Sequence, residues 1–182
     1  MTVNKHRRPS VSGAVFAIDP GMTLGWCLAQ PSGDFTCGTL VGGPRLLARW
    51  FASVMRNTAH KPLVVIERVY REVTGKHFEN DFVAHQVREL ERLADAYGLT
   101  VWYVDAMEPK SLINDSDKTG RRMPKKQARA AVHRITGVSP KTFHESDAVL
   151  IALYVKGLSE KTVFRNELDA MVVQHEQLGS LR

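Results

Sequence analysis

The sequence predicts an α/β protein in which helices flank a mixed, five-stranded sheet. Three short strand-like segments follow one another between residues 13 and 41 with only tight turns between them, which requires antiparallel pairing. Two further strand-like segments then alternate with helical segments, which is typical of parallel crossover units. A length of 182 residues suits one compact domain with a sizeable core.

The first three strands are predicted from apolar, β-favouring segments that end at turn residues. The segment Gly13–Ile18 ends at Asp19-Pro20-Gly21, and Thr23–Ala29 follows directly. A turn at residues 31–34 then leads into the third predicted strand, Phe35–Val41. The sequence therefore predicts an antiparallel meander at the start of the sheet.

The middle of the chain reads as a helix and then a buried strand. After Gly42-Gly43-Pro44, apolar residues recur at helical spacing. They are Leu46, Leu47, Trp50, Phe51, Val54 and Met55. The run Leu63–Ile66 is apolar throughout, as expected for a strand covered on both faces, and it ends at Glu67.

The second half of the chain predicts one more strand and several helices. A helix is expected over Phe78–Tyr97, ended by Gly98, followed by a strand over Thr100–Val104 and a polar loop over Asp105–Met123. Further helices are expected over Lys125–Ile135, Phe143–Leu158 and Val163–Leu178. This order is that of the RNase H-like fold, although the pattern alone does not exclude other α/β folds.

Composition and charge narrow the class of protein. No run of eighteen apolar residues is present, and the N-terminal segment lacks the apolar core of a secretory signal, so a cytoplasmic protein without a membrane span is expected. The net charge of +6 and pI near 9.5 suit a polyanionic partner. We expect a basic flexible arm at residues 1–12, a main domain at residues 13–158 and a helical extension at residues 159–182.

The two cysteines, Cys27 and Cys37, are too few for a disulfide framework or a structural zinc site. They could face each other across a hairpin. We favour two reduced core thiols.

The positive charge is concentrated in one stretch. Six cations lie within twelve residues: Lys118, Arg121, Arg122, Lys125, Lys126 and Arg129. Taken alone, this run is as consistent with a solvated face as with a nucleic-acid contact.

Three acids occupy positions that packing alone would not favour. Asp19 and Glu67 end apolar strands, and Asp147 lies on a helix that is otherwise apolar enough to be buried. Each could be a salt-bridged or capping carboxylate when considered singly. Adjacent central strands would bring Asp19 and Glu67 together at the strand ends, where α/β proteins build their sites. His144 precedes Asp147 by three positions and so shares its helix face, whereas Glu145 lies about 100° away.

Three of these segments, in order, resemble the motifs of the RuvC family of Holliday junction resolvases. Ala17–Trp26 resembles the opening Ile-Asp-Pro-Gly and Thr-x-Gly-Trp elements, and Val64–Tyr70 resembles the strand that ends in Glu with an aromatic three residues later. His144–Ala148 resembles the third motif, which usually reads Asp-x-x-Asp-Ala. The resemblance covers residues 14 to about 157 and implies the RNase H-like fold.

The resemblance implies that four residues are both catalytic residues and metal ligands: Asp19, Glu67, His144 and Asp147. They would hold two divalent cations, Mg²⁺ or Mn²⁺, for phosphodiester hydrolysis that leaves 5′-phosphate and 3′-hydroxyl ends. The departure is His144, where most members carry Asp. Because imidazole is the softer ligand, we expect the metal preference to shift from Mg²⁺ towards Mn²⁺.

The resemblance also implies contacts to branched DNA. Tyr70 matches an aromatic that reaches into the junction, and Lys125 begins a helix that resembles the family's Lys-x-Gln-Val start. The other predicted DNA-binding residues are Lys118, Arg121, Arg122 and Lys126. The usual glycine-rich loop before this helix keeps only Gly120. The resemblance further implies a homodimer, because a four-way junction needs two symmetric cuts. The family pairs through its second helix, here residues 78–97, although the apolar stripe of this helix could equally be core facing the sheet.

The function expected from these features is a structure-selective endodeoxyribonuclease that resolves four-way DNA junctions without a small-molecule cofactor. One alternative is the same chemistry on flaps, forks or RNA–DNA hybrids. A second, suggested by His144, is a non-catalytic DNA-binding protein. A sugar-kinase-like phosphotransferase ranks last, because the chain lacks the length for a second lobe and has no glycine-rich phosphate loop.

Overall fold

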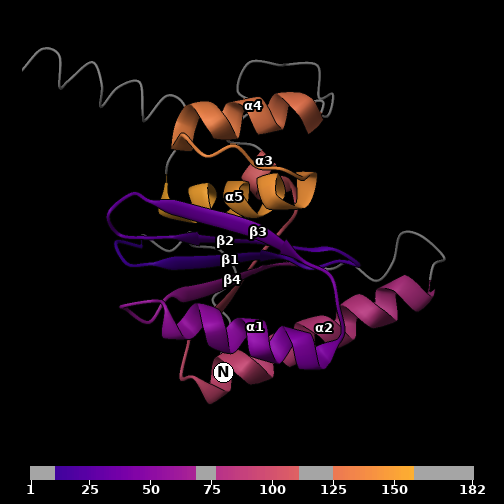
Figure 1. The fold of residues 1–182 in the computed structure, drawn as a ribbon. Helices are drawn as coiled ribbons and strands as arrows, with labels where there is room; N and C mark the ends of the chain where they lie inside the picture. Colours follow the sequence, from indigo (N-terminus) through magenta and orange to yellow (C-terminus); the bar gives the residue numbers. More distant parts are fainter. Residues whose placement is uncertain (1–10, 69–76, 111–124, 158–182) are drawn as a thin grey trace, which may run out of the picture.

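The computed structural model describes residues 11–68, 77–110 and 125–157 (Figure 1). The helical extension predicted for residues 159–182 lies outside the described residues, and so does the basic arm predicted for residues 1–12, apart from its last two positions. Within the described part of the chain, no helix is long and apolar enough to cross a bilayer.

A five-stranded mixed sheet forms the centre of the molecule, as predicted. Its strands are β1 (Val15–Asp19), β2 (Leu24–Ala29), β3 (Phe35–Leu40), β4 (Leu63–Glu67) and β5 (Val101–Val104). The spatial order is β3-β2-β1-β4-β5. Strands β1, β2 and β3 pair antiparallel, whereas β4 is parallel to both β1 and β5. The predicted meander and crossover units are confirmed.

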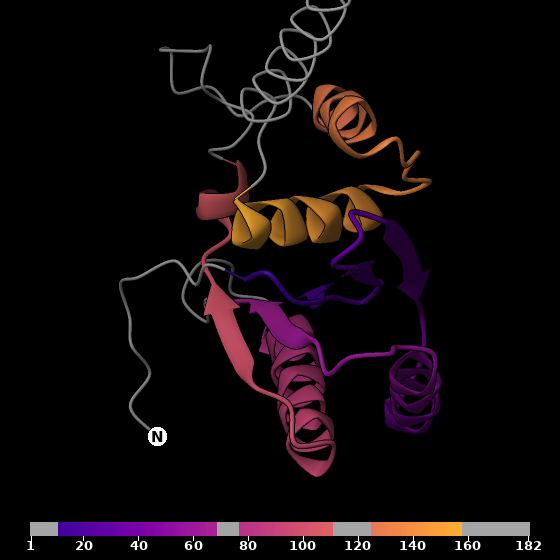
Figure 2. The same ribbon diagram turned by 90° about the vertical axis from the view of Figure 1, so that its left-hand side faces the viewer.

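Helices cover both faces of the sheet (Figures 1 and 2). On one face lie α1 (Pro44–Arg56) and α2 (His77–Ala96). On the other lie α3 (Met107–Lys110), α4 (Lys125–Thr136) and α5 (Phe143–Lys156), with α5 next to the sheet and α4 outside it. The prediction of a loop throughout Asp105–Met123 is wrong at α3, a single turn in which Glu108 N–H donates to the carbonyl oxygen of Asp105 over 2.9 Å.

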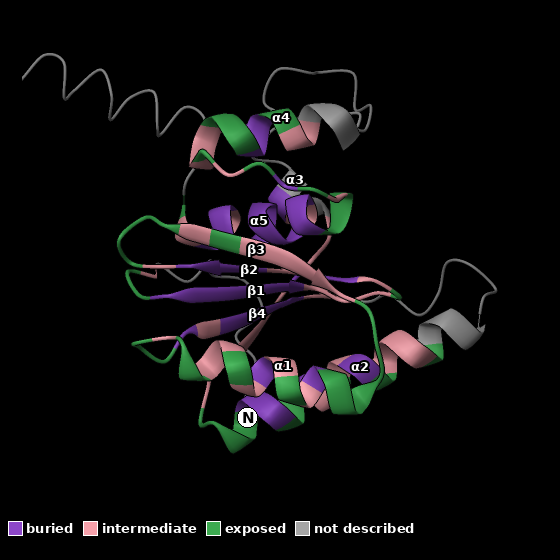
Figure 3. Cartoon of the chain, in the orientation of Figure 1, coloured by how far each residue is buried: buried purple, intermediate pink, exposed green. Residues whose placement is uncertain are grey.

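The alternation of side chains along each strand divides the core in two. On β1, Phe16 and Ile18 belong to the core under α1 and α2, whereas Val15 and Ala17 belong to the core under α5. The side chains of β4 alternate between the two cores in the same way, and Val65 belongs to the core under α5. Figure 3 shows the resulting buried strip through the central strands and α5.

Helix α5 is the central helix of its layer, as its apolar sequence predicted. Most of its residues between Ala148 and Val155 are buried against β1 and β2. Gly157 ends the helix in the left-handed conformation, at φ 74°, which glycine adopts without a steric penalty.

The helix expected to mediate a dimer packs its central apolar residues on its own sheet. Leu90, Leu93 and Ala94 of α2 are buried in the core with Phe16 and Ile66. This stretch of the stripe is therefore core. The homodimer stays a prediction.

The two cysteines face each other in register across β2 and β3, and both are free thiols. Burial, and then the neighbouring Cys37, raise the pKa of Cys27. Burial, and then the charge of Glu145, raise the pKa of Cys37. The favoured prediction of two reduced core thiols agrees with this arrangement.

Candidate active site

Two carboxylates lie at the adjacent ends of the parallel strands β1 and β4. Ile18 and Ile66 are paired in register, so Asp19 and Glu67, the next residue of each strand, are neighbours. Both follow Ala17 and Val65 by two positions, and those residues face α5. Because strand side chains alternate with a period of two, both acids lie on the α5 side of the sheet.

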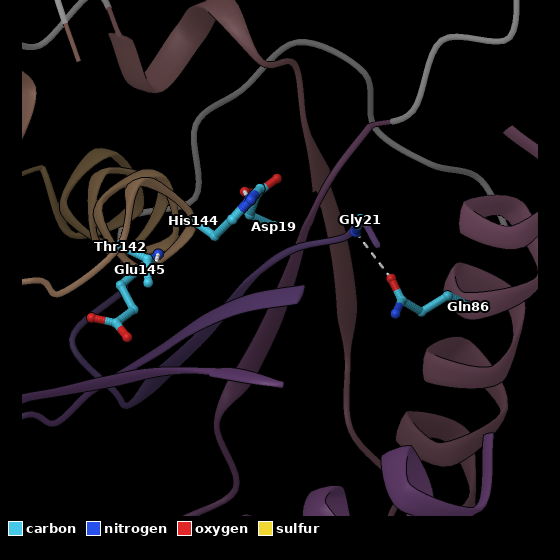
Figure 4. Close-up of polar contacts among 6 residues, drawn as sticks. All are labelled: Asp19, Gly21, Gln86, Thr142, His144 and Glu145. Carbon is cyan, nitrogen blue, oxygen red and sulfur yellow. Dashed lines mark hydrogen bonds and ion pairs between the residues drawn. The ribbon is translucent and has the colours of Figure 1, made fainter. Parts of the chain in front are cut away.

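His144 brings α5 to this pair of acids. Its Nδ1 lies 3.3 Å from Oδ2 of Asp19, although 125 positions separate the two residues in the sequence (Figure 4). The exposed fraction of the side chain is 46% for His144 and 14% for Asp19. The imidazole therefore lies at the rim of the site, with the Asp19 carboxylate below it.

A capping arrangement sets where α5 begins. The side-chain oxygen of Thr142 accepts a hydrogen bond from the backbone N–H of Glu145 over 3.1 Å. The buried carboxylate of Glu145 in turn accepts from the backbone N–H of Lys141, so the two side chains satisfy donors around the helix start. Glu145 is thus a helix cap turned away from His144, as its position on the helix predicted (Figure 4).

Gly25 allows α5 to approach the sheet at the site itself. Gly25 lies on β2 and is paired in register with Asp19 of β1. A β-carbon at this position would lie 2.0 Å from the carbonyl oxygen of His144 and 2.4 Å from its carbonyl carbon. Any other residue here must push the first turn of α5 outwards. In the sequence Gly25 is recognisable only as part of a motif, and its positioning role was not predicted.

Gln86 supports the turn that follows Asp19. This buried side chain of α2 accepts a hydrogen bond from the backbone N–H of Gly21 through Oε1, over 3.1 Å (Figure 4). The signal for this role in the sequence is a polar residue within an apolar helical stripe, but the role was not predicted. The contact ties the exit of β1 to the helix layer on the opposite face.

A third acid, Asp105, follows the neighbouring parallel strand β5. Its Oδ1 lies 3.6 Å from Nε of Arg68, the residue after Glu67, and Arg68 N–H donates to Val104 over 2.8 Å. Its signal was the same as for Asp19 and Glu67, namely an acid directly after a predicted strand. The ion pair gives this edge of the sheet a cation beside its acids.

Asp147 lies one turn beyond His144 on α5 and is half-buried. The structure therefore brings His144 into contact with Asp19, places Glu67 on the strand next to Asp19, and places Asp147 on the same helix as His144. In the described part of the chain, no three His, Cys, Asp or Glu side chains lie close enough together to hold a metal ion. The four-residue metal centre stays a prediction. Its members fit divalent cations in donor type, since carboxylate oxygens and an imidazole are ordinary ligands for Mg²⁺ and Mn²⁺.

The predicted DNA-binding residues are mostly beyond what the structure describes. Tyr70, Lys118, Arg121 and Arg122 lie outside the described residues, and so do the side chains of Lys125 and Lys126, whose backbone begins α4. Their roles stay predictions.

The fold is the RNase H-like fold, with acids at the ends of its central strands and a histidine beside one of them. Two solved structures have this fold. A complex of T. thermophilus RuvC with a Holliday junction substrate is 17% identical, covers 78% of this chain and 91% of its own, and has a TM-score of 0.59. A Thermus thermophilus RuvC structure is 20% identical, covers 78% and 92%, and has a TM-score of 0.53.

These comparisons confirm the predicted fold and the predicted likeness to RuvC at the level of the fold. No protein-family profile matches the sequence, and no curated protein matches it.

Proposed function

We propose that this protein is a structure-selective endodeoxyribonuclease that resolves Holliday junctions. The observation that carries the proposal is the contact between Asp19 and His144, beside Glu67, at the strand ends of a fold shared with RuvC. One of those RuvC structures contains a Holliday junction substrate. A site that combines carboxylates and an imidazole beside bound DNA suits hydrolysis of the phosphate backbone.

The residues that would hold two divalent cations, Mg²⁺ or Mn²⁺, are Asp19, Glu67, His144 and Asp147. When bound, such a pair activates water and neutralises the charge that develops on the phosphate. Water attack on phosphorus with loss of the 3′ oxygen leaves 5′-phosphate and 3′-hydroxyl ends.

The protein's own residues prepare this chemistry by orientation. A carboxylate only accepts, so the contact with Asp19 assigns the Nδ1 hydrogen to His144 and leaves the lone pair of Nε2 available. That nitrogen can bind a cation or accept a proton. Gly25 and the Thr142 cap hold the helix turn that carries the imidazole.

The biological setting follows from the substrate. Two symmetric cuts in a four-way junction require two sites, which a two-fold homodimer supplies. A cytoplasmic protein, bacterial or encoded by a phage, would meet such junctions during recombination and repair. No small-molecule cofactor is needed for this hydrolysis.

Cleavage of defined DNA substrates tests the proposal. Synthetic four-way junctions, flaps, forks and linear duplexes are incubated with the full chain and Mg²⁺ or Mn²⁺, and the cut ends are mapped. Symmetric cuts in the four-way junction, with 5′-phosphate ends, are expected. Equal cleavage of flaps and forks would favour the broader branched-DNA nuclease. Binding of junctions without cleavage in either metal would favour a non-catalytic junction-binding protein.

A further inference from the structure

An open groove of about 380 Å³ lies between α4 and the loop that leads into α5. It is lined by Arg129, Ala130, His133, Ser139 and Pro140. No residue of this groove belongs to the catalytic set, and only Arg129 was noted in the sequence, as the last cation of the basic run. The groove combines a guanidinium, an imidazole and a hydroxyl, which are all able to donate hydrogen bonds.

Arg129 is held in place without being neutralised. Its Nη2 donates to the carbonyl oxygen of Pro140, and its guanidinium carbon lies 5.8 Å from the ring centroid of Phe143. In the described part of the chain, no carboxylate pairs with it. A guanidinium fixed by an aromatic ring and a carbonyl keeps its remaining donors and its full charge for a ligand.

His133 and Ser139 form a second pair of polar groups in the groove. The Nδ1 of His133 lies 3.2 Å from the carbonyl oxygen of Val138 and 3.2 Å from Oγ of Ser139. A carbonyl oxygen only accepts, so Nδ1 carries the hydrogen and the hydroxyl of Ser139 also accepts from it. The hydroxyl hydrogen of Ser139 is then free to donate to a ligand.

The turn at the end of α4 brings these groups together. Gly137 has φ 72° and donates to the carbonyl oxygen of His133 over 2.8 Å, which folds the chain back towards the helix. The loop then runs to Phe143, the residue before His144. The groove therefore lies beside Phe143, the first residue of α5, which directly precedes His144 in the chain.

We propose that this groove binds a backbone phosphate of the DNA strand, next to the phosphate that is cut. The proposal rests on the proposed function, and it adds Arg129 and Ser139 as contacts to the strand, with His133 orienting the Ser139 hydroxyl. A phosphate presents acceptor oxygens to converging donors, and a preformed guanidinium is suited to bind it. The groove would then fix the register of the strand relative to Asp19 and His144.

The first test measures binding of a synthetic four-way junction over a range of salt concentrations, without divalent metal so that no strand is cut. Arg129→Gln should weaken binding about tenfold, as for a lost hydrogen bond to a charged group. The slope of log affinity against log salt should fall by about 0.9, because one phosphate contact releases about that many counterions. Ser139→Ala should weaken binding with no change in slope, since it removes no charge.

Arg49→Gln is the matched control, because it removes the same charge from an exposed position of α1 on the opposite side of the sheet. It should leave the slope unchanged. An equal effect of Arg49→Gln and Arg129→Gln would overturn the proposal, because net charge alone would then explain both. A normal slope and affinity in Arg129→Gln and Ser139→Ala would also overturn it.

A second measurement identifies the phosphate. Junctions with single neutral methylphosphonate groups near the cut are bound to the wild-type protein and to Arg129→Gln. At one position the methylphosphonate should weaken binding of the junction to the wild-type protein and leave its binding to Arg129→Gln unchanged. Equal losses at every position would refute a direct contact. If the wild-type protein cuts junctions but the groove variants bind normally, the groove proposal is wrong and the proposed function stands. If the wild-type protein neither binds nor cuts junctions, both the proposed function and the groove proposal are wrong.

Discussion

The two faces of the sheet are built from side chains of different size. The face under α1 and α2 holds a cluster of aromatic rings with centroid separations of 5.5–6.3 Å. They are Phe16, Trp26, Trp50, Phe51 and Tyr97. On the face under α5, no fully buried strand residue is larger than valine, and Ala17, Gly25, Cys27 and Ala29 are smaller still.

This difference in size separates stability from chemistry. Large rings bury much apolar area, and they hold α1 and α2 away from the strands. Small residues let the backbone of α5 lie directly on β1 and β2. A helix at such short range places His144 beside Asp19 with little freedom. A displacement of about 1 Å can cost a catalytic site about 10²-fold in rate. We therefore expect changes on the α5 face to alter cleavage and changes on the aromatic face to alter stability.

The largest effect on cleavage is expected for Asp19→Asn. It removes the carboxylate charge that contacts His144, so cleavage of a four-way junction should fall by about 10³-fold. Junction affinity should remain near that of the wild type, because basic side chains elsewhere supply most of the binding. Gel-shift and cleavage assays on the same preparation measure both. Loss of binding together with cleavage would contradict this division of labour.

A matched pair of glycine substitutions tests the comparison most directly. Gly25→Ala places a methyl group against the backbone of His144, and Gly38→Ala places one 2.8 Å from the ring of Trp26 on the aromatic face. Each should lower the free energy of unfolding by about 1–3 kcal/mol through overpacking.

Only Gly25→Ala should lower cleavage per folded molecule, by about 10²-fold in kcat with a smaller change in KM. Thermal unfolding measures the loss of stability, and single-turnover cleavage measures the loss of activity per folded molecule. If both variants lost cleavage equally, the close approach of α5 would have no special role.

A smaller effect is expected for His144→Asp. Carboxylate is as suitable a ligand as imidazole for a hard cation, so cleavage with Mg²⁺ should stay within about tenfold of the wild type. The ratio of activity in Mn²⁺ to activity in Mg²⁺ should fall, because the softer ligand has been removed. An inactive, folded variant would show that the imidazole does more than bind a cation.

The smallest effect on cleavage is expected for Phe51→Leu, on the aromatic face. Phe51 is fully buried between Phe16, Trp50 and Tyr97, so the smaller side chain should lower the free energy of unfolding by about 1–3 kcal/mol. Cleavage per folded molecule should be unchanged. Chemical denaturation and cleavage at a temperature well below the unfolding midpoint check both statements, and a specific loss of cleavage would break the separation between the faces.

The acids of the site could be predicted from the sequence, whereas the residues that position them could not. Asp19, Glu67 and Asp105 share a local signal, an acid directly after an apolar strand, and the sequence analysis used it for the first two. Gln86 has a weaker signal, a polar residue within an apolar helical stripe, and Gly25 has none that shows its role. A glycine in a strand and a glutamine in a helix become informative only when the element packed against them is known.

The sequence by itself determined the strands, the described helices except α3, and the acids that end β1 and β4, because alternation, helical spacing and turn residues are local properties of a chain. It also determined that His144 and Asp147 share a helix face. Only the tertiary structure decided that His144 meets Asp19 across 125 positions and that Gly25 makes room for it. Such contacts depend on how closely a helix packs on a sheet, and that distance is set jointly by side chains from separate elements.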